Sequence, residues 1–409
     1  IGFVAFAFVD TVVTASPLAH LAVAGDSDLF HTPWMYDHAN LALLRLSYPE
    51  FGWLLAGHLT TAALLLLALA RRRPDPERFM SLKKLLLATM VGAVTTFSFA
   101  PAMAADALDP ALRAKGRQAI DAGLHYLRGQ EAPDGSIMKS VGVTALALRA
   151  FLESPRRYNE SDGAFITRPV EFLLANVRPD GSICERLQET SYNTAVAVVA
   201  LAATKNPKYD SVIANARKFL IDHQVDEGEG YKPDHRFYGG IGYGGGERPD
   251  LANTVIALEG LRAASTDPKD PVWQKAVLFV SRSQNRSESN DQSWAGNDGG
   301  FIYMPGANLP QYDAGTGSYG SMTAAGLLSL LYAGSDKNDP RVQAAYKWLT
   351  DNYSLEVNPG TGKKLTLFYY YNAMAKVMAA YGQDSFVDRD GKRHNWRNEL
   401  VEKLVSLQQ

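Results

Sequence analysis

The chain has 409 residues, of which 46% are hydrophobic and 21% are charged, a composition typical of a globular protein. Its formal net charge of −2 gives no reason to expect nucleic acid as a partner. The chain has a single cysteine, Cys184, which excludes an intrachain disulfide, and we expect it to be a small side chain that is buried or half-buried.

The first hundred residues have the patterns of membrane and targeting segments. Residues 51–70 form an apolar run followed directly by three arginines, which predicts a transmembrane helix with a cytoplasmic C-terminal end. Residues 80–104 contain two lysines, an apolar stretch and a small-x-small cleavage pattern, which predicts a secretory signal peptide. Residues 1–79 are either a genuine anchor or an upstream segment joined by a misplaced start. Both interpretations place residues 105–409 in the periplasm or outside the cell, anchored to the membrane if residues 1–104 are retained.

From residue 105 onward the chain repeats a pair of helices. Five segments rich in Ala, Val and Leu predict helices buried on all sides, and they begin at Gly142, Tyr192, Ala252, Ser321 and Tyr371. Four of the five carry Thr at the third place, and the fifth has Ala373. A more amphipathic helix is expected before each segment, near residues 119–130, 168–176, 212–224, 273–284 and 341–353.

Turn residues separate these helices. Pro-Asp-Gly-Ser occurs at residues 133–136 and again at 179–182, and Asp-Gly supplies the positive φ that a tight turn needs. We find no alternating pattern that requires a sheet, although a short β-like pair can form near residues 299–304. Asparagine recurs just before the third place of the repeat, which predicts a shared structural task such as helix capping for Asn193, Asn253 and Asn372.

The pattern predicts an all-α fold in which buried inner helices and amphipathic outer helices close into an α/α toroid around a central cavity. An open solenoid is the competing arrangement. Five hairpins are visible, together with the outer helix of a sixth at residues 396–409. The longer connections in the third and fourth repeats would lie over one mouth of the barrel, where function tends to be located.

The turns carry a resemblance to a known family. Gln130, Gln224 and Gln284, each before a glycine-containing turn, resemble the degenerate Gln–Trp repeats of squalene and hopene cyclases. The Trp of that repeat is replaced here by Ile137, Ile183, Tyr231 and Phe301. Residues 242–254, 318–323 and 369–371 are similar to those of exported bacterial prenyltransferase/squalene-oxidase-repeat proteins. The resemblance covers roughly residues 110–409 and implies a double ring of six helix hairpins.

Comparison with that family also identifies chemistry that the chain lacks. A cyclase protonates an alkene with the motif Asp-x-Asp-Asp-Thr at the start of an inner helix, and the equivalent stretch here is residues 250–254, Asp-Leu-Ala-Asn-Thr. Ala252 takes the place of the proton-donating Asp, so we do not expect hopene-type cyclisation. Protein prenyltransferases hold zinc with Asp, Cys and His, and Cys184 does not fall in that pattern. We therefore expect no metal and no cofactor.

The remaining polar and aromatic residues form the candidate site. Asp250 is either the N-cap of its helix or a catalytic residue that faces the cavity. Successive helical residues point about 100° apart, so one or two of the tyrosines 369–371 would line the cavity and the others would pack. The candidate ligand-binding residues are Tyr243, Arg248, Asn253, Trp294, Tyr319, Tyr369, Tyr370, Tyr371 and Asn372.

We therefore expect an exported toroid without the cyclase acid, which binds an apolar or extended ligand or an exported protein partner. The alternative is an enzyme that uses the same barrel, either a terpenoid-modifying enzyme of the cyclase or prenyltransferase type or a polysaccharide-cleaving enzyme. The expected contact with a membrane is through the N-terminal segments alone.

Overall fold

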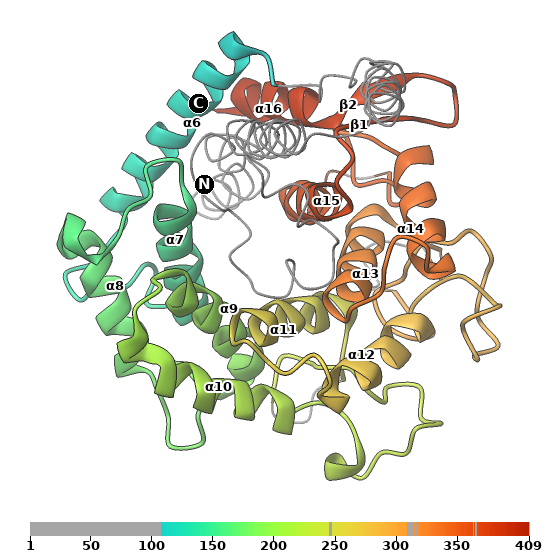
Figure 1. Ribbon diagram of the computed structural model, residues 1–409, viewed down its shortest axis with the longest axis horizontal. Coiled ribbons are helices and arrows are strands. Elements are labelled where there is room, and N and C mark those ends of the chain that lie inside the picture. The colour runs from blue at the N-terminus through green and yellow to red at the C-terminus, as the bar shows by residue number, and fades with distance from the viewer. Residues whose placement is uncertain are drawn as a thin grey trace, which may run out of the picture. The chain divides into compact units, whose positions relative to one another are not determined.

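The structure is a computed structural model that describes residues 108–244, 248–308, 315, 317–362, 364 and 366–408. The transmembrane helix predicted at 51–70 and the signal peptide predicted at 80–104 lie outside these residues. The described residues are mostly helical, which confirms the predicted all-α class (Figure 1). None of the described helices is long and apolar enough to cross a membrane.

Helices alternate along the chain between an inner row and an outer row (Figure 1). The inner row contains the five predicted buried segments, in α7 (Val141–Glu153), α9 (Thr190–Ala203), α11 (Leu251–Ala263), α13 (Gly320–Tyr332) and α15 (Leu367–Tyr381). The outer row contains the predicted amphipathic helices, α6 (Pro110–Gly129), α8 (Ala164–Ala175), α10 (Asp210–Asp222), α12 (Pro271–Arg282), α14 (Pro340–Asp351) and α16 (Trp396–Leu407).

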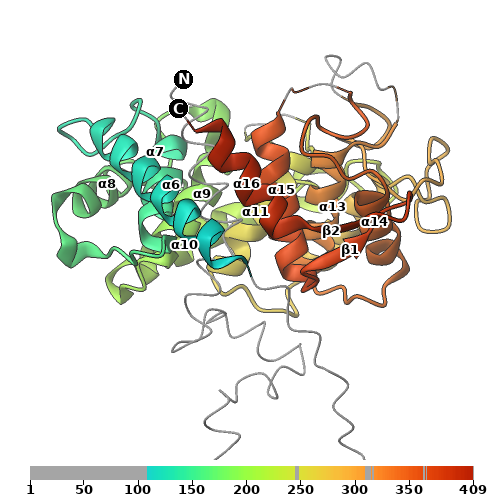
Figure 2. The same ribbon diagram turned by 90° about the horizontal axis from the view of Figure 1, so that it is seen from above.

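Neighbouring helices in the chain are also neighbours in space. The inner helices pack in chain order, α7 on α9, α9 on α11, α11 on α13 and α13 on α15. The last outer helix, α16, packs against the first, α6, and the two lie side by side in Figure 2. Gln408 Nε2 donates a hydrogen bond to the Ala119 carbonyl oxygen at 2.8 Å, so residues 289 positions apart are in contact.

The repeated threonine has one task in four hairpins. Its hydroxyl oxygen accepts a hydrogen bond from the backbone N–H of a buried residue in the turn before the helix. The donors are Ile137 to Thr144 and Ile183 to Thr194 at 2.9 Å, Ile241 to Thr254 at 3.1 Å, and Phe301 to Thr323 at 3.0 Å. The prediction that Tyr231 replaces a repeat Trp is therefore wrong, because Ile241 holds the position equivalent to Ile137 and Ile183.

A second repeated hydrogen bond joins each hairpin to the next. The N–H just before the repeat segment donates to the turn of the following hairpin, from Ser191 to Tyr243, from Leu251 to Tyr303 and from Gly320 to Pro359, each at 2.8 Å. In the first hairpin the acceptor is a side chain, and Val141 N donates to Glu185 Oε2 at 3.1 Å. These bonds place the N-terminal ends of α7, α9, α11 and α13 on the same side.

Glycines in the turns let the next outer helix approach closely. Gly239 has a φ of +88°, and a Cβ at this position would lie 1.8 Å from the Lys275 carbonyl oxygen of α12. Gly181, with a φ of +90°, lies in the same way against the Asn215 carbonyl oxygen of α10, at 2.6 Å. An L-residue would be strained at this φ and would push the helix away. The turn glycines therefore set the spacing between hairpins.

Some element boundaries differ from the prediction. Helix α6 begins at Pro110, well before the predicted residue 119, and Asp109 accepts hydrogen bonds from the first turn. The same Asp-Pro pair starts α12 and α14. Pro fits the first helical position and Asp is favoured at the N-cap, so this dipeptide is the local signal for the outer helices.

A short antiparallel hairpin of β1 (Ser385–Val387) and β2 (Arg393–Asn395) precedes α16 and was not predicted. Strands of three residues are too short to show an alternating pattern. His394 links this hairpin to α16, because its ring nitrogens lie 3.0 Å from Asp388 Oδ2 and 2.9 Å from Glu399 Oε2. At the β-like pair predicted near 299–304 there are isolated bridges, Gln284 with Phe301 and Met304 with Ala307.

Replacing Thr254 with Val should lower the free energy of unfolding by about 1–3 kcal/mol, because the buried Ile241 N–H loses its acceptor while the side-chain volume is kept. Thr254→Ser keeps the hydroxyl and should cost less. Urea denaturation of the purified protein measures both variants. A Thr254→Val variant as stable as the wild type would contradict the role given to the repeated threonine.

Candidate functional site

Asp250 is the N-cap of α11 and is only 2% exposed. Its Oδ1 accepts a hydrogen bond from Asn253 N at 2.9 Å, and its Oδ2 accepts one from Asn253 Nδ2 at 2.6 Å. The Tyr303 hydroxyl makes a further hydrogen bond to the same carboxylate. The N-cap interpretation of Asp250 is therefore confirmed, and both carboxylate oxygens are already engaged.

Burial raises the pKa of Asp250, although the hydrogen bonds from Asn253 and Tyr303 act in the opposite direction. Burial, together with the nearby Asp250 charge, raises the pKa of Tyr303, so this phenol stays protonated and donates to Asp250. The groups that act most strongly on the carboxyl are a backbone N–H, an amide and a phenol, with no second carboxylate among them. The arrangement engages both carboxylate oxygens in hydrogen bonds at the start of α11.

Tyr303, the partner of Asp250, lies near further tyrosines. Tyr243 and Tyr369 both lie close enough to Tyr303 to raise the pKa of its hydroxyl. Tyr243 is 37% exposed, and its ring centroid lies 6.2 Å from that of Tyr192 at the start of α9. We call Tyr192, Tyr243, Tyr303 and Tyr369 the tyrosine cluster. It joins the N-terminal ends of α9, α11 and α15.

The three consecutive tyrosines of α15 serve different purposes. Tyr369 lies in the tyrosine cluster, whereas Tyr370 and Tyr371 are fully buried. Tyr371 donates to the Leu355 carbonyl oxygen, and burial raises the pKa of both buried hydroxyls. Asn372 is half-buried and lies three residues after Tyr369, on the same face of the helix.

The other predicted ligand-binding residues lie in different surroundings. Tyr319 is 1% exposed and is the N-cap residue of α13. Trp294 packs near Gly306 in the connection between α12 and α13. Arg248 is exposed. Among the described contacts, none joins Arg248 or Trp294 to Asp250.

Asn193 and Asn253 share a structural task, as predicted, but the task is not helix capping. Each donates its amide to a carboxylate at the helix start, Asn253 to Asp250 and Asn193 Nδ2 to Glu185 Oε2 at 3.3 Å. Glu185 was not predicted. The N–H groups at the starts of α9, α11 and α13 donate to backbone carbonyl oxygens. The equivalent N–H group of α7 donates instead to the side chain of Glu185.

A second cluster of charged residues was missed altogether. Arg149 Nη1 of α7 lies 2.8 Å from Glu259 Oε1 of α11, and Lys376 Nζ of α15 lies 3.0 Å from Glu259 Oε2. These side chains are 11% to 16% exposed. We call Arg149, Glu259 and Lys376 the ion network. It connects three inner helices that are separated from one another by α9 and α13.

Glu259 is held in its charged form by its two partners. Burial would raise its pKa, but the charges of Arg149 and Lys376 outweigh burial and lower it. Arg149 also pairs with Glu153 at 2.8 Å, and burial raises the pKa of Glu153. The sequence contained a signal for this network, because Arg149 and Glu259 occupy the same eighth place of the repeat with opposite charges.

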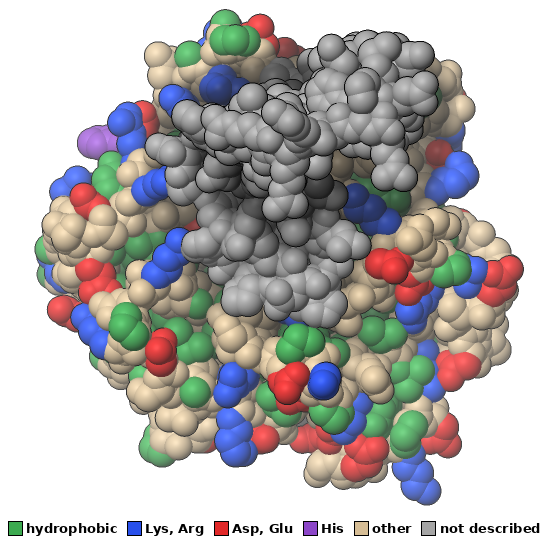
Figure 3. Space-filling model, viewed as in Figure 1, with side chains coloured by type: hydrophobic (Ala, Val, Ile, Leu, Met, Phe, Trp, Pro, Cys, Tyr) green, Lys and Arg blue, Asp and Glu red, His purple; other side chains and the backbone are tan. Residues whose placement is uncertain are grey.

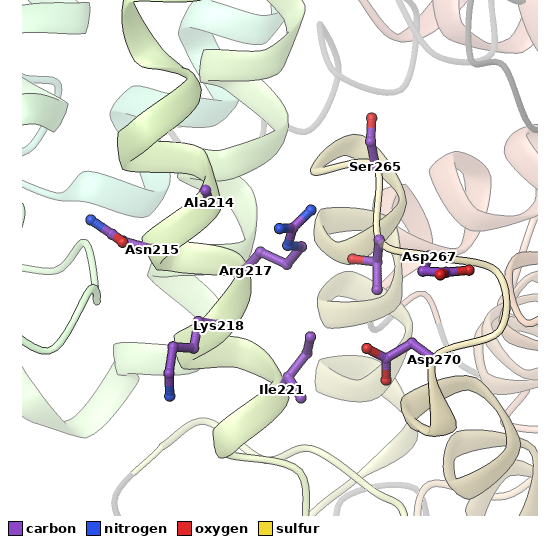
Figure 4. A pocket seen from close by; sticks show the side chains of 9 residues that line it. Ala214, Asn215, Arg217, Lys218, Ile221, Ser265, Asp267 and Asp270 are labelled. Atoms are coloured by element: carbon purple, nitrogen blue, oxygen red, sulfur yellow. The ribbon is translucent and has the colours of Figure 1, made fainter.

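A groove of about 540 Å³ lies elsewhere, between α10 and the connection from α11 to α12 (Figure 4). Its charged groups already have partners. Arg217 Nη1 donates to the Ala264 carbonyl oxygen at 3.1 Å, Asp270 caps α12, and Lys218 pairs with Asp222. None of the predicted site residues lines this groove, and we assign its charged groups to helix packing.

The remaining reactive and charged groups are scattered over the described residues. Cys184 is buried as predicted, and burial raises the pKa of its thiol. No group of three or more His, Cys, Asp and Glu side chains in the described ranges could hold a metal ion. Acidic and basic side chains are interspersed on the described part of the face in Figure 3.

In comparisons with known proteins, no family model matches the chain, and no curated protein matches it either. Its function is therefore inferred from the arrangement of its side chains.

Replacing Asp250 with Ala should lower the free energy of unfolding by about 2–4 kcal/mol, because the helix loses its cap and two buried donors lose their acceptor. The matched control is Asp109→Ala, which removes the exposed N-cap of α6 and should cost about 1 kcal/mol. Equal losses in thermal or urea denaturation would contradict the role of Asp250 as a buried acceptor for several donors.

Glu259→Gln should destabilise the protein at neutral pH by about 3–5 kcal/mol, because the partly buried Lys376 loses its counter-charge and Arg149 loses one of its carboxylate partners. The folded-state pKa of Glu259 lies below its unfolded value of about 4.3, so this stabilisation is present above that pH. It should be lost as the pH falls through the lower folded pKa, and the difference between variant and wild type should shrink there.

Urea denaturation between neutral and acidic pH measures this difference. Asp222→Asn, which breaks an exposed pair with Lys218, is the control and should cost about 0–1 kcal/mol. A Glu259→Gln penalty that does not depend on pH would contradict the ionic explanation.

Proposed function

We propose that residues 108–408 form an α/α toroid that binds an elongated, mainly apolar molecule at the tyrosine cluster and performs no acid catalysis. The contact between α16 and α6 supports closure of the two rows of helices. The ion network supports it independently, since in a solenoid each repeat contacts only its neighbours and side chains two hairpins apart do not meet. The inner faces of α7, α11 and α15 would then surround a common centre.

The tyrosine cluster supports a binding site at one end of this centre. Tyrosine rings offer large apolar surfaces together with a polar hydroxyl, and binding sites commonly combine aromatic walls with a few polar groups. The N-terminal ends of the inner helices lie on one side, so the cluster forms part of one rim. Tyr369 and Asn372 extend this surface along α15.

The proposed absence of acid catalysis rests on one observation, which is that both carboxylate oxygens of Asp250 accept hydrogen bonds. Its oxygens accept hydrogen bonds from Asn253 and Tyr303, and Ala252 stands where a cyclase would place its proton donor. The proposal agrees with the resemblance to exported squalene-cyclase-like repeat proteins without their acid motif. The export predicted from residues 80–104 would make an apolar molecule or another exported protein the available partner.

One observation favours the alternative of an enzyme. Perturbed pKa values often occur at catalytic sites, and burial raises the pKa of Asp250. A terpenoid-modifying or polysaccharide-cleaving reaction would then use Asp250 as an acid that is released from its cap when substrate binds. Product formation that is abolished by Asp250→Asn would favour this alternative over binding alone.

The binding proposal is tested by titrating the purified protein with dodecanol and with cellohexaose while intrinsic fluorescence is recorded. Dodecanol should bind, and Tyr369→Ala should weaken its binding about tenfold, because an aromatic wall of the site is lost. Tyr381→Ala is the control, since Tyr381 lies at the other end of α15 and stacks on Tyr346 with a centroid distance of 3.7 Å. Binding of cellohexaose without binding of dodecanol would contradict the proposed ligand class.

A further inference from the structure

His394 of β2 lies in a buried position beside α16. It is 6% exposed, whereas the other histidines in the part of the chain that the structure describes are half-buried or exposed, namely His125, His223 and His235. Phe386 of β1 stacks on the His394 ring at a centroid distance of 5.3 Å, and Tyr353 meets it edge-on at 4.8 Å. These aromatic rings hold the imidazole in one position, so its two nitrogens have fixed partners.

Each ring nitrogen of His394 faces a carboxylate. Nε2 lies 3.0 Å from Asp388 Oδ2, and Nδ1 lies 2.9 Å from Glu399 Oε2. An ionised carboxylate only accepts hydrogen bonds, and a neutral imidazole carries a single N–H. Both contacts are therefore hydrogen bonds at the same time only when the ring is protonated on both nitrogens. The hydrogen bond from His394 also holds the pKa of Asp388 below its ordinary value.

The nearby cations have other partners. Arg393 Nη2 donates to Ser385 Oγ at 2.8 Å, and Arg397 Nε lies 2.6 Å from Asp384 Oδ1. Arginine and ionised carboxylates ordinarily keep their charges between pH 5 and pH 8, so these pairs do not respond to pH in that range.

Tyr353 is the third titratable side chain against the His394 ring, after the two carboxylates. Burial, together with the nearby Glu399 carboxylate, raises the pKa of Tyr353, so this phenol stays neutral. Histidine is the side chain that ordinarily changes its charge between pH 5 and pH 8. A change of pH across this range is therefore expected to act on this junction through His394.

The two carboxylates belong to different elements. Asp388 directly follows β1, and Glu399 lies in the first turn of α16. Helix α16 lies beside the hairpin and packs against α6 (Figure 2). If the ring loses one proton, a nitrogen lone pair faces one of the carboxylates, and a buried charge-assisted hydrogen bond is lost. The hairpin and the start of α16 are then held together less firmly.

We propose that His394 is a pH-sensitive latch, whose imidazolium ties the β1–β2 hairpin to α16 at lower pH and releases α16 from the hairpin when it loses a proton. Because α16 packs against α6, release also loosens the contact between the last and the first described helices. The latch goes beyond the proposed function and is independent of what the tyrosine cluster binds.

The experiment measures backbone hydrogen–deuterium exchange of the purified protein at pH 5 and at pH 8, corrected for the intrinsic exchange rate at each pH. In the wild type, the opening equilibrium of α16 should be about tenfold more favourable at the higher pH, because a charge-assisted hydrogen bond is lost. Helix α9 packs against α7, α10 and α11 and serves as an internal reference that should show no such change.

Two variants test the cause of this difference. His394→Gln has a neutral side chain at both pH values, so α16 should open equally at both. In Glu399→Gln, a neutral ring can donate to Asp388 through Nε2 and accept from the introduced amide through Nδ1, so the difference should largely disappear. His125→Gln changes an exposed histidine of α6 and should behave as the wild type. Exchange in α9 shows whether each variant is folded, and Glu399→Gln decides the matter if His394→Gln is not.

Equal opening of α16 at both pH values in the wild type would overturn the latch. So would a pH-dependent difference that persists in the folded His394→Gln or Glu399→Gln variant. If α9 loses its protection together with α16 at the higher pH, the whole protein is loosened and α16 is not released on its own, which also overturns the proposal.

Discussion

The hydrogen bonds at the start of α7, α9, α11 and α13 are the interactions on which the rest of the structure depends. The first N–H groups of a helix have no partner within it, and in a buried helix they must be satisfied by other parts of the protein. Here the turn of the following hairpin supplies the acceptor, and the repeated threonine holds the preceding turn. Each hairpin therefore requires its successor, and this requirement aligns the helix starts on one side.

Much of the fold could be predicted because this requirement leaves a local pattern in the sequence. Thr at the third place, apolar residues around it and a glycine turn before it are all visible within a few residues. The identity of the turn residue in the third hairpin was not visible, because the long connection offers both Tyr231 and Ile241. The backbone contact of Ile241 with Thr254 decides between them. The ion network was missed for a related reason, since opposite charges on helices two hairpins apart attract notice only after the helices are placed in space.

Some residues of the candidate site lie near one another, but their roles differ from the predicted ones. Asp250, Asn253, Tyr243 and Tyr369 belong together, as the sequence indicates, but the asparagine donates to the carboxylate and does not cap. Tyr303, the residue that completes the cluster, lies more than fifty residues away in the sequence and has no local signal. Arg248 was grouped with Asp250 because it lies two residues before it, and Trp294 was included as an aromatic residue of a long connection. Among the described contacts, neither residue touches Asp250.

The contact between α16 and α6 suggests that the helices could be connected in a different order along the chain. The last described helix lies beside the first, and Gln408 near the end of the described chain contacts Ala119 in the middle of α6. Joining these two helices by a linker and opening the backbone at an exposed turn elsewhere would leave the same helices in contact. The contacts between neighbouring hairpins would therefore be kept in such a permuted chain.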